Sequence, residues 1–286
     1  MNTDTILTGL KSFELKYNPE FLEAVLDKKE EITPYLIAAL EQVRDDPKRQ
    51  LKEYDDELYI YALILLGHFQ EPQAHQVIID LFSLPEPFPE ELFGDIITEC
   101  LPILLLRTCG GSIEGIKSLI LNKNAYEFSR GSAIVAMSYA WVEGIVPRSE
   151  LLSFFGGLFT GDEAAPDSFF YSQLAYTLCD ICPEELVDVL NDALDRELFN
   201  DISINQDDIQ QALDLGQEKS LARLREEIAK ASLDNIYEAI EYCTGAQIGM
   251  LPPPVITQPQ VNKPKTNQVW KQPNLKPKKK KNFWEL

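Results

Sequence analysis

Two cysteines, Cys179 and Cys182, have the Cys-x-x-Cys spacing that metal sites and redox pairs use. A helix through them would place both sulfurs on one face. A structural zinc site needs four ligands, and the sequence supplies neither a second pair of cysteines nor a histidine nearby. The pattern therefore favours two small buried residues in a helix over metal or redox chemistry, and we predict no metal ligand.

The two histidines of the chain, His68 and His75, lie seven residues apart across a turn marked by Glu71 and Pro72, so they could approach each other. A catalytic role would require a serine or cysteine nucleophile in a recognisable turn, or a third metal ligand, and the sequence supplies neither. It also lacks a glycine loop that could hold a phosphate. We interpret both histidines as ordinary surface or turn residues, and we predict no catalytic residue, no cofactor-binding residue and no cofactor.

Three aspartates, Asp188, Asp192 and Asp195, fall at positions i, i+4 and i+7 of a helix predicted over residues 184–198. They lie opposite the apolar stripe of that helix and form an acidic row. A solvated helix face explains such a row in the ordinary case. The alternative is that the row is part of an acidic surface for a cationic partner, so the three aspartates are candidate partner-binding residues.

The C-terminal residues combine a basic cluster with aromatic side chains. Proline, asparagine, glutamine and lysine dominate residues 251–286, and this composition predicts a disordered tail that packs no core. The candidate partner-binding residues of the tail are Lys278, Lys279, Lys280, Lys281, Phe283 and Trp284. Four consecutive lysines can simply keep a disordered end soluble. Aromatic residues beside a basic cluster also suit docking to a protein groove, to RNA or to a membrane surface.

Charge separates sharply along the chain. Of the 26 basic and 46 acidic residues, residues 252–286 hold eight lysines and one acid, a formal charge of +7. The preceding residues hold the other 18 bases and 45 acids, a formal charge of −27. Because nucleic acids and anionic lipids need a positive surface, this balance argues against nucleic-acid binding by the body of the protein, and only the tail could attract such partners.

Helices must position these residues, because apolar residues recur at helical spacing from about residue 18 to 198. The clearest stripe covers residues 92–105 and predicts one helix, kinked at Pro102, which removes a backbone hydrogen bond. Period-two alternation between turn residues is missing from the sequence, so we predict an all-α fold. Short turns between the helices make consecutive helices antiparallel neighbours.

The helix pairs repeat. Alignment on Ala62, Ile97, Ala133 and Ala175 gives intervals of 35, 36 and 42 residues, and residues 30–198 resemble HEAT repeats, which predicts an α-solenoid. We divide the chain into a HEAT-like helical-repeat body at residues 1–204, C-terminal capping helices at 205–250 and the tail at 251–286. Thin apolar stripes on polar helices are typical of a terminal cap, whose outer face no further repeat covers.

Size, helical N-terminal segment, repeat body and basic tail together resemble the DUF1186 family, known from cyanobacteria and chlamydiae. The resemblance implies a bacterial protein of a family without an assigned function. Some such proteins end in a zinc-binding SEC-C motif, but this chain has no cysteine or histidine after Cys243, so the resemblance implies no metal there.

Five cysteines, an odd number without framework spacing, predict reduced thiols and no disulfide. The N-terminus lacks the charged and apolar regions of a signal peptide, and the sequence has no apolar stretch of about 18 residues that could span a membrane. These features predict a cytoplasmic protein.

We therefore expect a non-enzymatic protein–protein interaction scaffold with an acidic solenoid surface and a basic tail contact. Its protein partner is unknown, and the tail could bind the acidic body itself or an anionic partner. Two alternatives stay open. One is a bilin-lyase-like or other cofactor-handling enzyme on HEAT-like repeats, which rests on analogy of fold. The other is RNA or ribosome binding through the tail.

Overall fold

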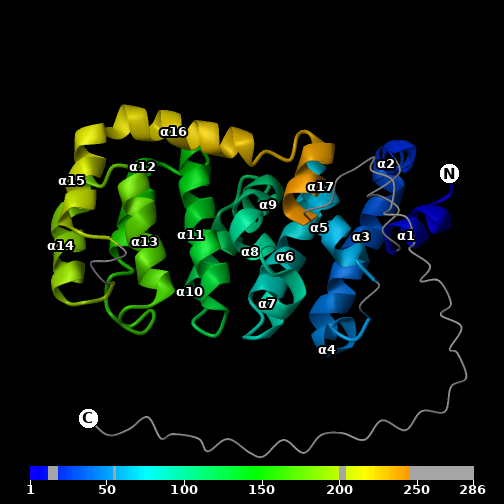
Figure 1. Ribbon diagram of the computed structural model, residues 1–286, viewed down its shortest axis with the longest axis horizontal. Coiled ribbons are helices and arrows are strands. Elements are labelled where there is room, and N and C mark those ends of the chain that lie inside the picture. Colours follow the sequence, from blue (N-terminus) through cyan, green and yellow to red (C-terminus); the bar gives the residue numbers. More distant parts are fainter. Residues whose placement is uncertain (12–18, 54–55, 200–203, 245–286) are drawn as a thin grey trace, which may run out of the picture. The chain divides into compact units, whose positions relative to one another are not determined.

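The computed structural model describes residues 1–11, 19–53, 56–199 and 204–244, and every regular element within these ranges is a helix (Figure 1). The predicted all-α class is confirmed. The chain divides into two units, Met1–Leu251 and Pro252–Leu286. The second unit, with the tail residues predicted to bind a partner, lies outside the described residues. Among the described helices, none has both the length and the hydrophobicity that crossing a membrane requires.

The described elements follow one another with short connections. They are α1 Thr3–Lys11, α2 Pro19–Leu26, α3 Lys29–Asp45, α4 Pro47–Gln50, α5 Leu58–His68, η2 Pro72–Ala74, α6 His75–Phe82, α7 Phe88–Phe93, α8 Ile96–Glu99, α9 Leu101–Thr108, α10 Glu114–Leu121, α11 Glu127–Val142, α12 Arg148–Gly156, α13 Phe169–Asp180, η3 Glu184–Leu186, α14 Val187–Asp195, α15 Gln206–Leu215, α16 Gln217–Lys230 and α17 Ile236–Thr244.

Longer helices of the first unit pack side by side in chain order: α3 contacts α5, α5 contacts α9, α9 contacts α11, and α11 contacts α13. Shorter helices separate these longer ones in the sequence. Among the shorter helices, α6 and α10 contact each other, while α6 also packs on α3 and α10 on α11. The result is two layers of helices. The assignment of these pairs to the HEAT repeat, and to a solenoid, stays a prediction.

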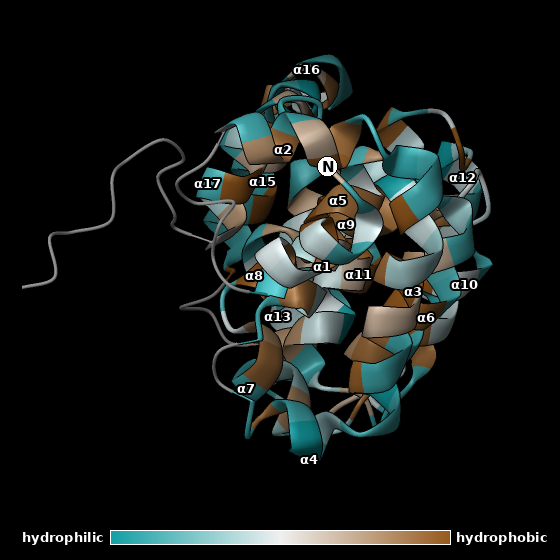
Figure 2. Ribbon diagram, turned by 90° about the vertical axis from the view of Figure 1, so that its right-hand side faces the viewer, coloured by the Kyte–Doolittle hydropathy of each residue, from teal (hydrophilic) through white to brown (hydrophobic). Residues whose placement is uncertain are grey.

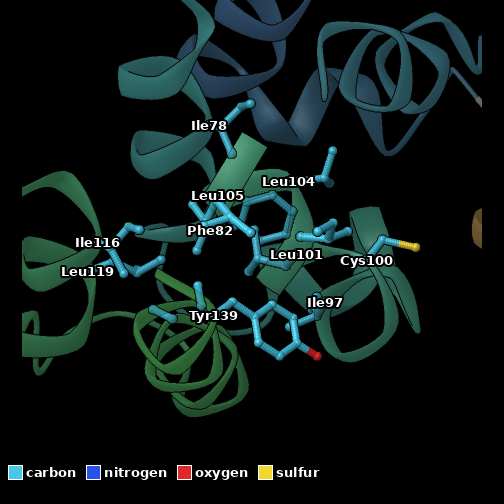
Figure 3. Packing of buried hydrophobic residues seen from close by; sticks show 14 of the residues in the cluster. Ile78, Phe82, Ile97, Cys100, Leu101, Leu104, Leu105, Ile116, Leu119 and Tyr139 are labelled. Atoms are coloured by element: carbon cyan, nitrogen blue, oxygen red, sulfur yellow. The ribbon is translucent and has the colours of Figure 1, made fainter. Parts of the chain in front are cut away.

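A continuous apolar core lies between the two layers. Figure 3 shows its centre, where Ile78 and Phe82 of α6 meet Leu101 and Leu105 of α9, with Tyr139 of α11 nearby. The innermost helix is α5, which is hydrophobic on all sides because α3, α9 and α17 cover it, and it is drawn mostly in brown in Figure 2. Burial of such side chains contributes about 1.5–3 kcal/mol each.

The single kinked helix predicted over residues 92–105 is wrong, because the structure has three short helices there. Gly94 ends α7 with a φ of +48°, a conformation that residues with a Cβ rarely adopt. Pro102 is the second residue of α9, where a missing N–H leaves no helical hydrogen bond unmade. Proline therefore begins a new helix here and does not kink an existing one.

The last three helices run back over the others. While α15 contacts α13, α16 contacts α11, and α17 packs on α5 and α8, in the first half of the chain. We call residues 217–244, which comprise α16, the connection 231–235 and α17, the strap. The division into a repeat body and capping helices stays a prediction. Within the strap, Leu233, Ile236 and Ile240 are buried, and α17 packs on the much earlier helices α5 and α8.

Candidate functional site

A cavity of about 830 Å³ lies between the second half of α16 and the C-terminal ends of α9 and α11. We call it the strap groove. Its apolar lining is Ile103, Leu106, Val142, Ile145, Ile228 and Ala229, and its charged lining is Arg107, Glu143, Arg225 and Asp234. Cavities of this size are typical of binding sites in proteins.

The groove exists because the second half of α16 carries few apolar residues. In α16 only Ser220 and Leu224 are buried, and the following turn, from Arg225 to Lys230, offers Ile228 alone as a large apolar side chain. A second hollow of about 320 Å³ lies on the other flank of α16, lined by Tyr139, Lys230 and their neighbours. Ile103 of α9 lines both spaces, so this part of α16 has open volume on either side.

The strap is attached at its beginning through α13. Arg223 of α16 donates a hydrogen bond to the carboxylate of Asp180, at the C-terminal end of α13. Next to this ion pair, Leu224 is buried, with 2% of its surface exposed. These contacts place the first half of α16 across the ends of the long helices.

A second attachment lies at the connection between α16 and α17. Nδ1 of His68 donates to the carbonyl oxygen of Leu233 at 2.7 Å, and Arg107 pairs with Asp234. The Leu233 side chain packs so closely on α5 that a Cβ placed on Gly67 would lie 2.5 Å from it. A buried leucine and two polar contacts therefore fix the far edge of the groove.

A disulfide between Cys100 and Cys243 joins α17 to the start of α9, with 6.2 Å between the two Cα atoms. The expectation of five reduced thiols and no disulfide is wrong for this pair. The two cysteines are 143 residues apart in the sequence, and their meeting depends on the return path of the strap, which local spacing does not reveal. Cys109, Cys179 and Cys182 are free.

The Cys-x-x-Cys pair does not share a helix face. Cys179 belongs to α13, which ends at Asp180, and Cys182 follows with a φ of +63°. Burial raises the pKa of Cys179 to about 12, so that at neutral pH this residue is a thiol and not a nucleophilic thiolate. Within the described ranges, no three or more histidine, cysteine, aspartate and glutamate residues are grouped so that they could hold a metal.

The two histidines have separate partners. His68 binds the strap, whereas Nδ1 of His75 lies 3.0 Å from Oγ1 of Thr108. Burial lowers the pKa of His75, so its ring is neutral at physiological pH. Both residues are half-buried, and each has a structural partner.

Asp188, Asp192 and Asp195 are exposed on α14, and Asp192 also pairs with Arg196 at 3.0 Å. The acidic row does not line the strap groove, whose walls come from α9, α11, α16 and adjoining turns. Its role in partner binding stays a prediction. The candidate residues of the tail, from Lys278 to Trp284, lie outside the described residues.

Sequence reasoning missed the strap groove. Its walls combine residues from positions 70 to 234, and each wall residue taken alone is an ordinary member of a helix or turn. The one available signal was the sparse apolar stripe of α16, which indicates a helix without a tightly packed underside.

Asp180 of α13, which pairs with Arg223 of the strap, gives a test of the attachment at the beginning of the strap. Burial raises the pKa of its carboxyl to about 6, with Arg223 opposing and Glu227 adding to the shift. Because the folded protein holds this proton more tightly than the unfolded chain, the group makes the protein more stable at about pH 4–5 than at about pH 7. The effect is small, since 43% of the side chain is exposed and solvent screens it.

We expect the variant Asp180→Asn to lack this component of the pH dependence. Urea unfolding of both proteins at about pH 5 and about pH 7.5 measures it, on either side of the shifted pKa. The stability of the wild type relative to the variant should fall as the pH rises between these values. A constant difference would contradict the raised pKa.

Comparison with known proteins places the chain beside others without an assigned role. The family described as "Protein of unknown function (DUF1186)" matches residues 1–247. An uncharacterized protein of Chlamydia trachomatis is 28% identical over 225 residues, which are 78% of this chain and 86% of that protein. An uncharacterized protein of Chlamydia muridarum is 27% identical over 227 residues, 78% and 88% of the two chains. No solved structure matches.

Proposed function

We propose, for a chain that belongs to the DUF1186 family of proteins of unknown function, a non-enzymatic role as a protein-interaction scaffold. In this proposal the strap groove binds a basic, amphipathic segment of a partner protein. Neither the family description nor the names of the relatives indicate an enzyme activity. The observation that carries the proposal is the groove itself, a cavity lined by both apolar and charged side chains in a strongly acidic protein.

The lining of the groove supports an amphipathic partner. Val142, Ile145 and Ile228 are half-buried and surround the opening, while Ile103 and Leu106 lie deeper. Partner side chains that filled this space would remove apolar surface from water on both sides, which contributes about 25 cal/mol per Å². Anchoring side chains in such pockets provide most of the energy of many protein interfaces.

Charge supports a basic partner. Asp234 neutralises Arg107, and the remaining charged groups of the groove, Glu143 and Arg225, balance each other. The C-terminal ends of α9 and α11 add partial negative charge at the opening. Residues 1–251 carry a formal charge of −27, so the surrounding field attracts cations and repels acidic segments.

Two further surfaces belong to the proposal. The acidic row on α14 adds to the field that attracts a cationic partner. The tail, with its eight lysines, supplies a second contact with an acidic part of the same partner. Two linked contacts strengthen binding because the second is made at a high effective concentration.

A direct test measures fluorescence anisotropy of a labelled peptide with leucines at helical spacing and lysines elsewhere. A matched peptide with glutamates in place of the lysines is the charge control. We expect the full chain to bind the lysine peptide, with an affinity that falls as salt rises, and not the glutamate peptide. Equal binding of the two peptides would contradict the proposal.

The chain offers a matched pair of variants for the same assay. Ala229 lines the groove, and Ala222, seven residues earlier on α16, is exposed outside it. Arginine at position 229 fills the groove and repels a cation, so we expect Ala229→Arg to weaken binding about tenfold, equivalent to 1.4 kcal/mol. Ala222→Arg adds the same charge without filling the groove. Equal losses in both variants would show that the peptide binds elsewhere.

A further inference from the structure

We propose that the Cys100–Cys243 disulfide is a redox latch that controls access to the strap groove. In the oxidised protein the disulfide holds α17 in place and keeps the strap down, and reduction lets the strap lift. What enters the groove rests on the proposed function above. The movement of the strap itself is independent of any partner.

The position of the disulfide suits a latch, because it secures the far end of the strap. Cys243 lies in the last turn of α17, and Cys100 lies between α8 and α9, beneath it. All of the strap that borders the groove, from Arg225 to Asp234, lies between this covalent bond and the ion pair of Arg223 with Asp180. The second half of α16 can therefore move away only if one of its two ends is released.

Packing beneath the second half of α16 is sparse, so this part of the strap depends on the attachment of its two ends. Hollows flank the second half of α16, and a third, of about 410 Å³, lies along residues 230–242. Few buried apolar contacts are the mark of segments that open locally at low free energy. After reduction, Leu233, Ile236 and Ile240 still hold the strap, but its end is no longer tied.

The two sulfurs differ in exposure, and this difference decides which of them a reductant attacks. Cys100 is completely buried, whereas Cys243 is half-buried. A thiolate of a small dithiol attacks the Cys243 sulfur, a mixed disulfide forms, and the Cys100 sulfur leaves and takes up a proton. The second thiol of the reductant then closes its own disulfide and releases the Cys243 thiol. A small-molecule disulfide reverses the two steps and takes up the electrons.

Hydrogen–deuterium exchange of the full chain, read by mass spectrometry, tests the latch without a partner. On reduction by a dithiol we expect the early amide exchange, which reports local opening, to become about tenfold faster in residues 225–244 and to stay unchanged in α3 and α13. Cys243→Ser should exchange like the reduced wild type and should not respond to the reductant. Cys179→Ser, at another half-buried cysteine, should respond like the wild type.

Three results would overturn the latch. One is unchanged exchange in residues 225–244 after the gain of two hydrogens confirms reduction. Another is a titration of all five cysteines as free thiols in the air-oxidised protein. The third is a rise in early exchange spread evenly over all helices, which would show that opening is not confined to the strap.

Peptide binding separates this inference from the proposed function. Reduction should increase the rate at which the lysine peptide associates. If exchange responds to reduction but no peptide binds, the latch stands and the proposed partner is wrong. If the peptide binds in the groove at the same rate in both redox states, the proposed partner stands and the latch is wrong.

Discussion

Replacing Arg130 by alanine is expected to lower the free energy of unfolding by about 3–5 kcal/mol, the usual loss when one partner of a buried ion pair is removed. Arg130 of α11 is 3% exposed. Its Nε donates to the carbonyl oxygen of Ile120 at 2.8 Å, and its Nη1 donates to that of Glu163 at 2.9 Å. The guanidinium also lies 3.9 Å from the ring centroid of Phe170.

The cost arises from the groups left behind. Burial lowers the pKa of Arg130, and the Glu163 carboxylate, 3.5 Å away, partly offsets this desolvation. Without the guanidinium, two carbonyl oxygens lose this hydrogen-bond donor inside the fold, and the carboxylate keeps Lys123, 3.6 Å away. The arginine thus joins the end of α10 to the loop that follows α12.

Urea unfolding followed by circular dichroism measures the loss. Arg49 provides a matched control, because it pairs with Glu53 at 2.9 Å while 63% of its side chain is exposed. Arg49→Ala should change the stability by less than about 0.5 kcal/mol, as is usual for an exposed ion pair. If Arg130→Ala costs no more than Arg49→Ala, the buried network contributes nothing.

The helical class could be predicted because it depends on local periodicity. The stripe of Leu58, Tyr61, Ala62, Leu65 and Leu66 places apolar residues on one side of a helix, and the structure has α5 at these residues. Likewise, helical spacing predicted that Asp188, Asp192 and Asp195 share an exposed face of α14. A property of a few neighbouring residues is readable from their order.

Features that depend on distant segments were not predictable in this way. The break between α7, α8 and α9 depends on the backbone at Gly94 and on the start of a helix at Pro102, inside an unbroken apolar stripe. The strap reaches α5 and α8 because three apolar residues of a mostly polar sequence find a buried place there. Periodicity shows which face of a helix is buried, but it does not show which other helix covers that face.

The same reason explains why the groove and the disulfide escaped sequence reasoning. Cys100 lies within an apolar stripe and Cys243 near the end of a polar helix, and neither position indicates the other. Only the fold brings them together. An odd number of cysteines without regular spacing is therefore a weak argument against a disulfide when the chain folds back on itself.

Cys243→Ser should lower the free energy of unfolding of the oxidised protein by about 5 kcal/mol, the loop-closure entropy that a disulfide across 143 residues removes from the unfolded chain. Reduction of the wild type should produce a loss of the same size. The variant should be equally stable with and without reductant, because it has no cross-link to lose.

Guanidinium unfolding of both proteins in both redox states measures this difference, and Cys179→Ser controls for the exchange of sulfur for oxygen at a half-buried position. That control should keep the full response to reductant. If reduction does not bring the wild type down to the stability of Cys243→Ser, the cross-link stabilises less than chain entropy requires. The return of the strap to α5 and α8 would then depend on the burial of Leu233, Ile236 and Ile240 alone.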